Sequence, residues 1–218
     1  MTADGRVEVR RLVLVRHGRT AWNAERRFQG HADVELDDTG HRQAARVAPY
    51  LAGFAPAQLW SSDLARARQT AAYVEKETGL VARLDARLRE FDVGERTGLT
   101  FDEAGLRFPA QHAELLAGRP GVVAGAETQE DVLARMMPAY DELLAALVPG
   151  ETAVVVTHGA CLRHAVATLL GWAEEVAGSL RTLDNCGLAV LDEVPATGAM
   201  RLSSWNPDPD FAALGRAR

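Results

Sequence analysis

The sequence predicts an α/β fold: a three-layer sandwich with a mainly parallel central sheet, an edge hairpin and a helical cap insertion. Short, uninterrupted apolar runs at Leu12–Val15 and Ala153–Val156 are typical of strands buried on both faces. Amphipathic stretches of helical length separate the runs, and strands that alternate with helices favour a mainly parallel sheet covered by helices.

Length and composition limit the class of protein. The 218 residues fit one domain, and we expect a single domain over 1–218. The chain is 47% hydrophobic and 25% charged, which excludes wholesale disorder. Its net charge of −6 makes nucleic acid and anionic lipid poor partners, so an anionic ligand must be held by a local cluster of arginines.

The first half of the chain alternates three short strands with two helices. The strands are expected at 12–15, 58–61 and 81–84. The helices are expected from Thr39 to about Leu51, and from a cap at Ser62 or Asp63 to Thr78, where Gly79 ends the second one.

The second half begins with a helical insertion. A capping box from Thr100 to Glu103 opens a short helix, and further helices are expected at 108–117 and 128–147. We expect the region 98–150 to form a cap over the ligand pocket and to set specificity. After the second apolar strand come a helix to about Leu170, a hairpin at the sheet edge and, after Asn206, a loose tail.

A histidine follows each apolar strand, at the strand ends where α/β sheets bind ligands. In Arg16-His17-Gly18, a loop carbonyl could hold one imidazole nitrogen and leave the other free as a nucleophile. His158 precedes Gly159 at a strand-to-helix junction, whose free N–H groups suit a phosphate. Taken alone, each histidine is more readily a structural residue satisfied by loop groups.

Two more charged residues complete a candidate site for phosphoryl transfer, which needs positive donors around the phosphate and an in-line nucleophile. Arg66 and Arg68 face different directions on their helix, and Arg68 is predicted to fork onto the phosphate oxygens. Glu90 has apolar neighbours that suit a general acid, but spacing alone does not choose between Glu90, Asp92 and Glu95.

Five stretches in order, spanning about Leu12 to Leu191, resemble the histidine phosphatase superfamily in its phosphoglycerate-mutase-like branch. They are LVLVRHGRTAWN, FQGHADVELDDTGHRQA, WSSDLARARQTA, LREFDVGERTG and VVVTHGA. The resemblance implies a phosphomonoester hydrolase that forms a phosphohistidine, needs no metal or other cofactor, and acts on a small phosphorylated metabolite. A sugar phosphate or (glucosyl-)3-phosphoglycerate would be such a substrate.

The resemblance also assigns roles to residues. It implies that His17 is the nucleophile, that Arg16, Arg68 and His158 form the phosphate pocket, and that Glu90 donates the proton to the leaving group. By position, it further implies that Asn23, Gln29 and Gly159 contact the substrate.

The chain departs from the family pattern at two arginines. Arg19 stands where members commonly have Glu or Gln, and Arg96 replaces the tryptophan of a G-x-W-x-G pattern. These departures put the usual substrate preference in doubt: either arginine could favour a more highly charged ligand or simply face solvent.

Three other functions stay open. A phosphoglycerate mutase would use the same residues, although the 68 positions from Glu90 to His158 are few for a mutase. A non-catalytic phospho-ligand binder has no need of the acid. A metallohydrolase would need ligands such as His158, Cys161 and His164, with no HExxH motif or paired carboxylates to support them.

The two cysteines, Cys161 and Cys186, cannot build a disulfide framework and indicate a reducing compartment. No apolar run reaches the roughly 18 residues that a membrane helix needs. We therefore expect a cytoplasmic protein without nucleic-acid or membrane partners, with the oligomeric state open and a homodimer as one option.

Overall fold

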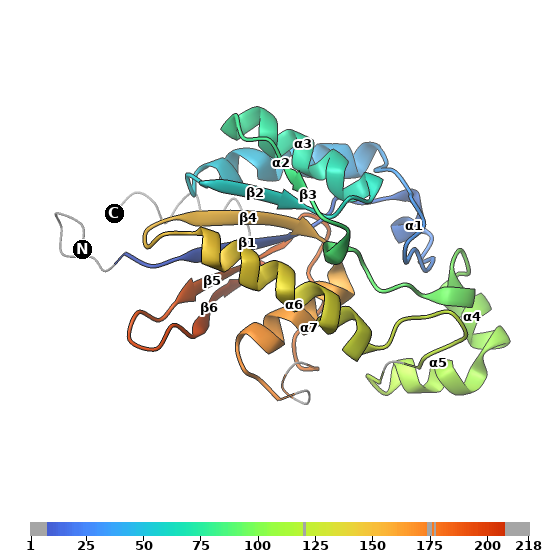
Figure 1. The fold of residues 1–218 in the computed structure, drawn as a ribbon. Coiled ribbons are helices and arrows are strands. Elements are labelled where there is room, and N and C mark those ends of the chain that lie inside the picture. The colour runs from blue at the N-terminus through green and yellow to red at the C-terminus, as the bar shows by residue number, and fades with distance from the viewer. Residues whose placement is uncertain (1–7, 120, 174–175, 177, 208–218) are drawn as a thin grey trace.

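The computed structural model describes residues 8–207 except 120, 174–175 and 177, and it has the predicted α/β architecture (Figure 1). Six strands form one sheet: β1 (Arg11–Arg16), β2 (Gln58–Ser61), β3 (Arg83–Leu84), β4 (Thr152–Thr157), β5 (Leu188–Glu193) and β6 (Met200–Trp205). Their spatial order is β3-β2-β4-β1-β5-β6. The loose tail expected after Asn206 falls mostly on 208–218, which lie outside the described residues.

The sheet is parallel in its centre and antiparallel at one edge. Strands β1, β4, β2 and β3 pair in parallel, while β5 runs antiparallel to β1 and pairs with β6 as the expected edge hairpin. The side chains of β4 are all buried, as are the four central residues of β1. This two-sided burial explains why the two strands are continuous apolar runs.

Seven α-helices and two 3₁₀ helices are found in the described residues. They are α1 (Ala21–Ala24), α2 (Asp38–Ala52), α3 (Ala65–Thr78), α4 (Phe101–Arg107), α5 (Pro109–Leu116), α6 (Gln129–Ala146), α7 (Gly159–Leu169), η1 (Ala86–Leu88) and η2 (Gly94–Arg96). Helices α2 and α3 cover one face of the sheet, and α6 and α7 cover the other (Figure 1).

Two helix starts differ from those expected. The side chain of Asp37, not Thr39, caps α2 by accepting a hydrogen bond from the Gly40 amide at 2.8 Å. Helix α3 begins at Ala65 with no side-chain cap. Both shifts are local, and both predicted helices are present.

The predicted cap range, 98–150, is longer than the segment that projects from the sheet. Its last helix, α6, buries Val132, Met136, Tyr140 and Leu143 in the core beneath the sheet, so α6 is a layer of the sandwich. Only α4 and α5 project beyond the sheet, and within them Ala104 is the one buried residue (Figure 1). An amphipathic helix follows its apolar stripe, and the stripe of α6 packs on the sheet.

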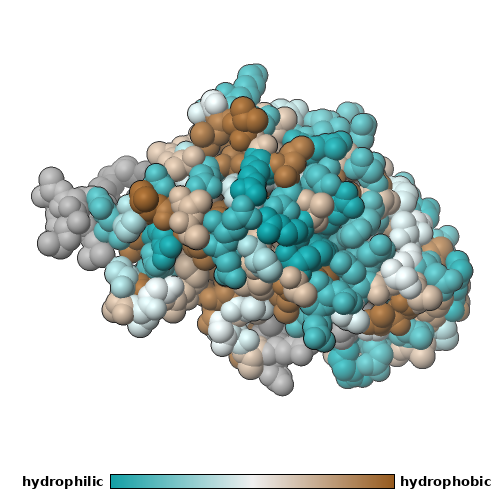
Figure 2. All heavy atoms as spheres, in the orientation of Figure 1, coloured by the Kyte–Doolittle hydropathy of each residue, from teal (hydrophilic) through white to brown (hydrophobic). Residues whose placement is uncertain are grey.

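Polar groups dominate the face in Figure 2, with apolar groups scattered among them. The core is divided by the sheet into two clusters of buried apolar side chains. No helix in the described part of the chain combines the length and apolar character required to span a bilayer.

Candidate active site

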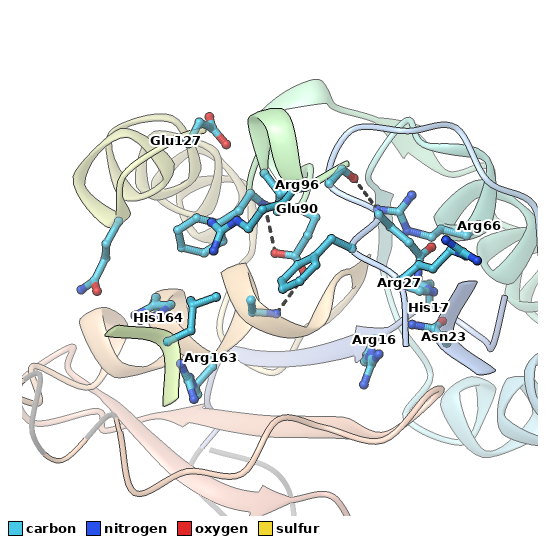
Figure 3. A pocket seen from close by; sticks show the side chains of 18 of the residues that line it. Arg16, His17, Asn23, Arg27, Arg66, Glu90, Arg96, Glu127, Arg163 and His164 are labelled. Atoms are coloured by element: carbon cyan, nitrogen blue, oxygen red, sulfur yellow. Dashed lines mark hydrogen bonds between the residues drawn. The ribbon is translucent and has the colours of Figure 1, made fainter. Parts of the chain in front are cut away.

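A cavity of about 360 Å³ opens where β1 and β4 end. Six arginines and two glutamates are among its lining residues: Arg16, Arg27, Arg66, Arg96, Arg119, Arg163, Glu90 and Glu127. We call it the main cavity (Figure 3). In a protein of net charge −6, this local excess of guanidinium groups makes the cavity suited to an anionic ligand.

His17 follows the last residue of β1 and lines the main cavity, although it is only 3% exposed. Its Nδ1 lies 2.7 Å from the carbonyl oxygen of Gly18. A carbonyl only accepts, so Nδ1 carries the proton and Nε2 keeps its lone pair. Burial, then the charges of Arg66 and Arg16, hold the pKa of His17 well below its usual value. The ring is therefore neutral and has a free nucleophilic nitrogen at physiological pH.

Arg16 lies at the end of β1, directly before His17. Its Nη1 donates to the carbonyl oxygen of Leu183 at 2.6 Å, and its Nε is buried with no hydrogen-bond partner among the described residues. Burial lowers the pKa of Arg16, with Glu90 acting in the opposite direction. The guanidinium keeps donor capacity that a phosphate oxygen can use.

The arginine of α3 that lines the main cavity is Arg66. The prediction that Arg68 lies in the phosphate pocket was wrong. Arg66 is 1% exposed, and its two terminal nitrogens donate to the carbonyl oxygens of Ala32 and Gly30, each at 2.8 Å. Burial lowers its pKa to about 10. Arg68 does not line the main cavity; its side chain is 46% exposed, and it donates to the carbonyl oxygen of Asp63 at 2.9 Å.

A signal in the sequence could have separated the two arginines. Arg66, Thr70 and Val74 are spaced by four residues, so they share one side of α3, and all three are buried. Arg68 is displaced by two residues and lies on the solvent side. The helical stripe, followed from Val74 backwards, leads to Arg66.

His158 is wholly buried beside His17, with the ring centroids 5.1 Å apart. Its Nδ1 accepts a hydrogen bond from Arg66 Nε at 3.2 Å, and its Nε2 lies 2.8 Å from Ser62 Oγ. Burial, then the charge of Arg66, lower the pKa of His158 well below its usual value. The structure thus brings His158 next to His17, although His158 does not itself line the cavity.

Glu90 lines the main cavity and caps helix α7. Its Oε2 accepts from the Ala160 amide, and its Oε1 accepts from the amides of Cys161 and Phe91, each at 2.9 Å. Asp92 and Glu95, which spacing alone left as rivals, do not line this cavity. Each carboxylate oxygen has two lone pairs, so Oε2 can still reach a ligand oxygen.

The backbone that carries Glu90 is fixed by Arg135 from α6. The two terminal nitrogens of Arg135 donate to the carbonyl oxygens of Arg87, Arg89 and Glu90, each at 2.8 Å. Its Nε also pairs with Glu127 at 2.7 Å. Sequence reasoning missed this arginine because its partners are main-chain groups far away in the sequence.

The expected substrate contacts are distributed unevenly. Asn23 and Gln29 line the main cavity, and the buried Oε1 of Gln29 has no partner among the described residues. Asn185 Nδ2 donates to Asn23 Oδ1 at 3.2 Å and to the carbonyl oxygen of His17 at 3.1 Å. Gly159 is not a lining residue; it packs against Arg16, whose Nε would be 3.2 Å from a Cβ added there.

The geometry gives no support to the metal alternative. Among the described residues, no group of three or more His, Cys, Asp or Glu side chains is placed to hold a metal ion. His158 is engaged by Arg66 and Ser62, while the His164 ring packs edge-on against Phe91 at 5.6 Å. His158 therefore has a role in hydrogen bonding and His164 a role in packing.

Comparison with known proteins decides the family. The model of the histidine phosphatase superfamily (branch 1) matches residues 12–207. The chain belongs to the histidine phosphatase superfamily. This confirms the resemblance on which the site residues were predicted, and it makes the protein an enzyme of that family.

The relatives of this chain have two kinds of name. A glucosyl-3-phosphoglycerate phosphatase of Mycobacterium tuberculosis (strain ATCC 25618 / H37Rv) is 37% identical over 95% of this chain and 92% of its own. A probable phosphoglycerate mutase GpmB of Cronobacter sakazakii is 36% identical over 82% of this chain and 83% of its own. Among solved structures, a mycobacterial glucosyl-3-phosphoglycerate phosphatase complexed with VO3 has a TM-score of 0.83 at 35% identity, covering 91% of this chain and 100% of its own.

Proposed function

We propose that this protein is a phosphomonoesterase that hydrolyses a small phosphorylated metabolite through a phosphohistidine on His17, without a metal cofactor. The observation that carries the proposal is the state of His17. The ring is held neutral, Nδ1 is occupied by the Gly18 carbonyl, and Nε2 is free in a cavity flanked by Arg16 and Arg66.

In the first step, Nε2 of His17 attacks phosphorus and forms the P–N bond while the ester P–O bond breaks. Arg16 and Arg66 stabilise the charge on the equatorial phosphoryl oxygens. Glu90, protonated for this step, gives its proton to the leaving alkoxide and becomes a carboxylate. Its place at the cavity wall supports this role.

In the second step, the Glu90 carboxylate takes a proton from a water molecule whose oxygen attacks phosphorus. The P–N bond breaks, inorganic phosphate leaves, and His17 recovers its lone pair. Glu90 is again protonated, which closes the cycle with atoms and charges balanced.

The alternative is a phosphoglycerate mutase, because relatives at similar identity carry that name. The same phosphohistidine would then be handed back to a second hydroxyl group instead of water. We favour the phosphatase because the relative with the greater coverage is named as one. The cavity of about 360 Å³ accommodates a small phosphate ester, which both activities require.

Rapid-quench experiments with a panel of phosphate esters test the proposal. We expect an acid-labile phosphoenzyme in the native protein that is lost in His17→Ala together with turnover. Turnover that persists at the native rate in His17→Ala would contradict it. A mutase would convert phosphoglycerates in the presence of a bisphosphorylated primer without releasing phosphate. Activity that disappears on treatment with EDTA would overturn the metal-free mechanism.

We keep three predictions from the sequence. The protein is cytoplasmic, it has no nucleic-acid or membrane partner, and a homodimer is one option for its oligomeric state. Both cysteines are free and buried, which suits a reducing compartment.

A further inference from the structure

One arginine of the main cavity, Arg96, is buried and has no counter-ion in the part of the chain that the structure describes. Arg96 is 6% exposed, and its Nε and Nη1 have no hydrogen-bond partner among the described residues. Burial lowers its pKa, with no carboxylate acting in the opposite direction. Its guanidinium carbon lies 5.2 Å from the centroid of the Phe28 ring, but a ring face leaves the N–H groups without acceptors. A buried charge in this state calls for an anion.

Four other arginines of the cavity already have acceptors. Arg16 donates to Leu183, Arg66 to Gly30 and Ala32, Arg27 to Glu25, and Arg119 to Glu114. Arg163 resembles Arg96 in one respect, since its Nε is buried without a partner among the described residues. Arg96 and Arg163 thus line the cavity with N–H donors that have no acceptor among the described residues, in addition to the arginines beside His17.

The two ends of the cavity are separate in space. In Figure 3, Arg16, Arg66 and His17 lie at one end, Arg163 and His164 lie at the other, and Arg96 lies between the two ends in this view. A phosphate bound at His17 would therefore leave Arg96 and Arg163 to the rest of the ligand.

The backbone holds Arg96 firmly in place. The Phe28 amide donates to the Leu99 carbonyl and the Gly98 amide donates to the Phe28 carbonyl, each at 2.9 Å, on one side of η2. On the other side, the Glu95 amide donates to the Ala124 carbonyl at 3.1 Å. A donor held on such a backbone loses little conformational entropy when a ligand binds.

We propose that Arg96, with Arg163, binds a second anionic group of the substrate. The substrate class is then a phosphomonoester that also carries a carboxylate or a second phosphate. This inference rests on the proposed function for the phosphate end only.

A matched pair of esters tests the proposal. 3-Phosphoglycerate and glycerol 3-phosphate differ in a carboxylate against a hydroxymethyl group, and 2,3-bisphosphoglycerate supplies a second phosphate instead. We expect the native enzyme to prefer the doubly anionic esters. We expect Arg96→Gln to reduce the kcat/KM ratio of 3-phosphoglycerate to glycerol 3-phosphate by about 10- to 100-fold, mainly through KM. Arg96→Lys should recover part of this preference.

Arg68→Gln is the control, since it makes the same change of charge at an exposed position outside the cavity, and it should leave the ratio unchanged. Equal losses on both esters in Arg96→Gln would show a structural role and overturn the proposal. If thermal unfolding shows that Arg96→Gln does not fold, the same ratio of kcat/KM measured for Arg163→Gln and for the native enzyme still tests the proposal. A native enzyme that prefers glycerol 3-phosphate would refute it.

Failure of the proposed function has a different signature. If the native enzyme releases phosphate from none of the esters, calorimetric binding of the same pair to His17→Ala measures the anion preference without turnover. Tighter binding of 3-phosphoglycerate would then support the Arg96 subsite even though the hydrolase proposal had failed, and equal affinities would reject both.

Discussion

Arg66 donates from Nε to Nδ1 of His158 across 3.2 Å and so joins α3 to the start of α7. A guanidinium only donates, so Nδ1 of His158 is the acceptor, and in the neutral ring the proton lies on Nε2, facing Ser62 Oγ. Burial is the main cause that lowers the pKa of both His158 and His17, and the positive charge of Arg66 acts in the same direction. One buried arginine therefore sets a tautomer and adds to the effect of burial on two histidines.

The first prediction compares the two arginines of α3. Arg66→Gln removes a cavity charge and a partner of His158, and we expect kcat/KM for p-nitrophenyl phosphate to fall by about 10²- to 10³-fold. Arg68→Gln makes the same change on an exposed side chain and should leave the steady-state rate close to native. A comparable loss in Arg68→Gln would mean that the cavity is wrongly assigned.

This pair also marks where sequence reasoning was sufficient and where it failed. The strand ends and His17 followed from the apolar runs, because a doubly buried strand has an unmistakable composition. The choice between Arg66 and Arg68 depended on which side of α3 faces the core. That side is set by the packing of Ala67, Ala71 and Val74 of α3 into the core, and a shift of two positions along the helix moves a residue to the opposite side.

The prediction of how far the cap extends was wrong for a related reason. Most of its residues were predicted to form helices, and helical periodicity does not say which surface a helix covers. Tyr140 and Met136 of α6 are fully buried against the sheet, whereas α5 has no buried residue. The contact of Arg135 with three main-chain carbonyls lay beyond sequence reasoning altogether, since no side-chain pattern encodes a carbonyl position.

The second prediction concerns Glu90→Gln. The amide keeps one oxygen to accept from the α7 amides but has no proton to give to an alkoxide. For an alkyl ester such as glycerol 3-phosphate, we expect turnover to fall by about 10²- to 10⁴-fold. With p-nitrophenyl phosphate, whose leaving group needs no acid, the first step should survive while hydrolysis of phosphohistidine slows for want of a base.

Stopped-flow absorbance distinguishes the two cases. Glu90→Gln should release nitrophenol in a burst of about one equivalent per site and then turn over slowly, with phosphoenzyme accumulating. A uniform slowing of both esters without a burst would show that Glu90 acts only as the cap of α7, a role worth about 0.5–2 kcal/mol of stability.

The third prediction is a loss of stability at mildly acid pH. Burial lowers the pKa of His17 and His158 well below the usual value and that of His164 to about 4. Above pH 6.5 both the folded and the unfolded chain leave these rings neutral. Below it, the unfolded chain takes up protons that the native protein does not, so the free energy of unfolding decreases by about 1.4 kcal/mol per pH unit for each histidine.

Urea unfolding at pH 7, 6 and 5 measures this slope. Paired carboxylates contribute mainly below about pH 5, outside this window. The double variant His17→Asn, His158→Asn should show a shallower dependence, whatever its absolute stability. An unchanged slope would mean that the two rings take up protons in the folded protein as readily as in the unfolded chain.

The last prediction tests the close backbone approach beside His17. A Cβ added to Gly18 would lie 2.7 Å from the carbonyl oxygen of Gly40 in α2, so the loop or the helix must move. The Gly18 carbonyl also holds Nδ1 of His17, so movement of the loop turns the imidazole. We expect Gly18→Ala to cost about 1–3 kcal/mol of stability and to lower kcat for phosphate esters.

Gly105→Ala in α4 is the matched control, because its Cβ meets the ring of His112, a side chain that can shift. Its unfolding free energy and kcat should stay near native, since alanine suits a helix interior better than glycine. If Gly18→Ala unfolds and turns over as the native enzyme does, the backbone contact with Gly40 is not what aims His17. The free Nε2 of His17 would then owe its direction to Asn185, which donates to the His17 carbonyl, and to the end of β1.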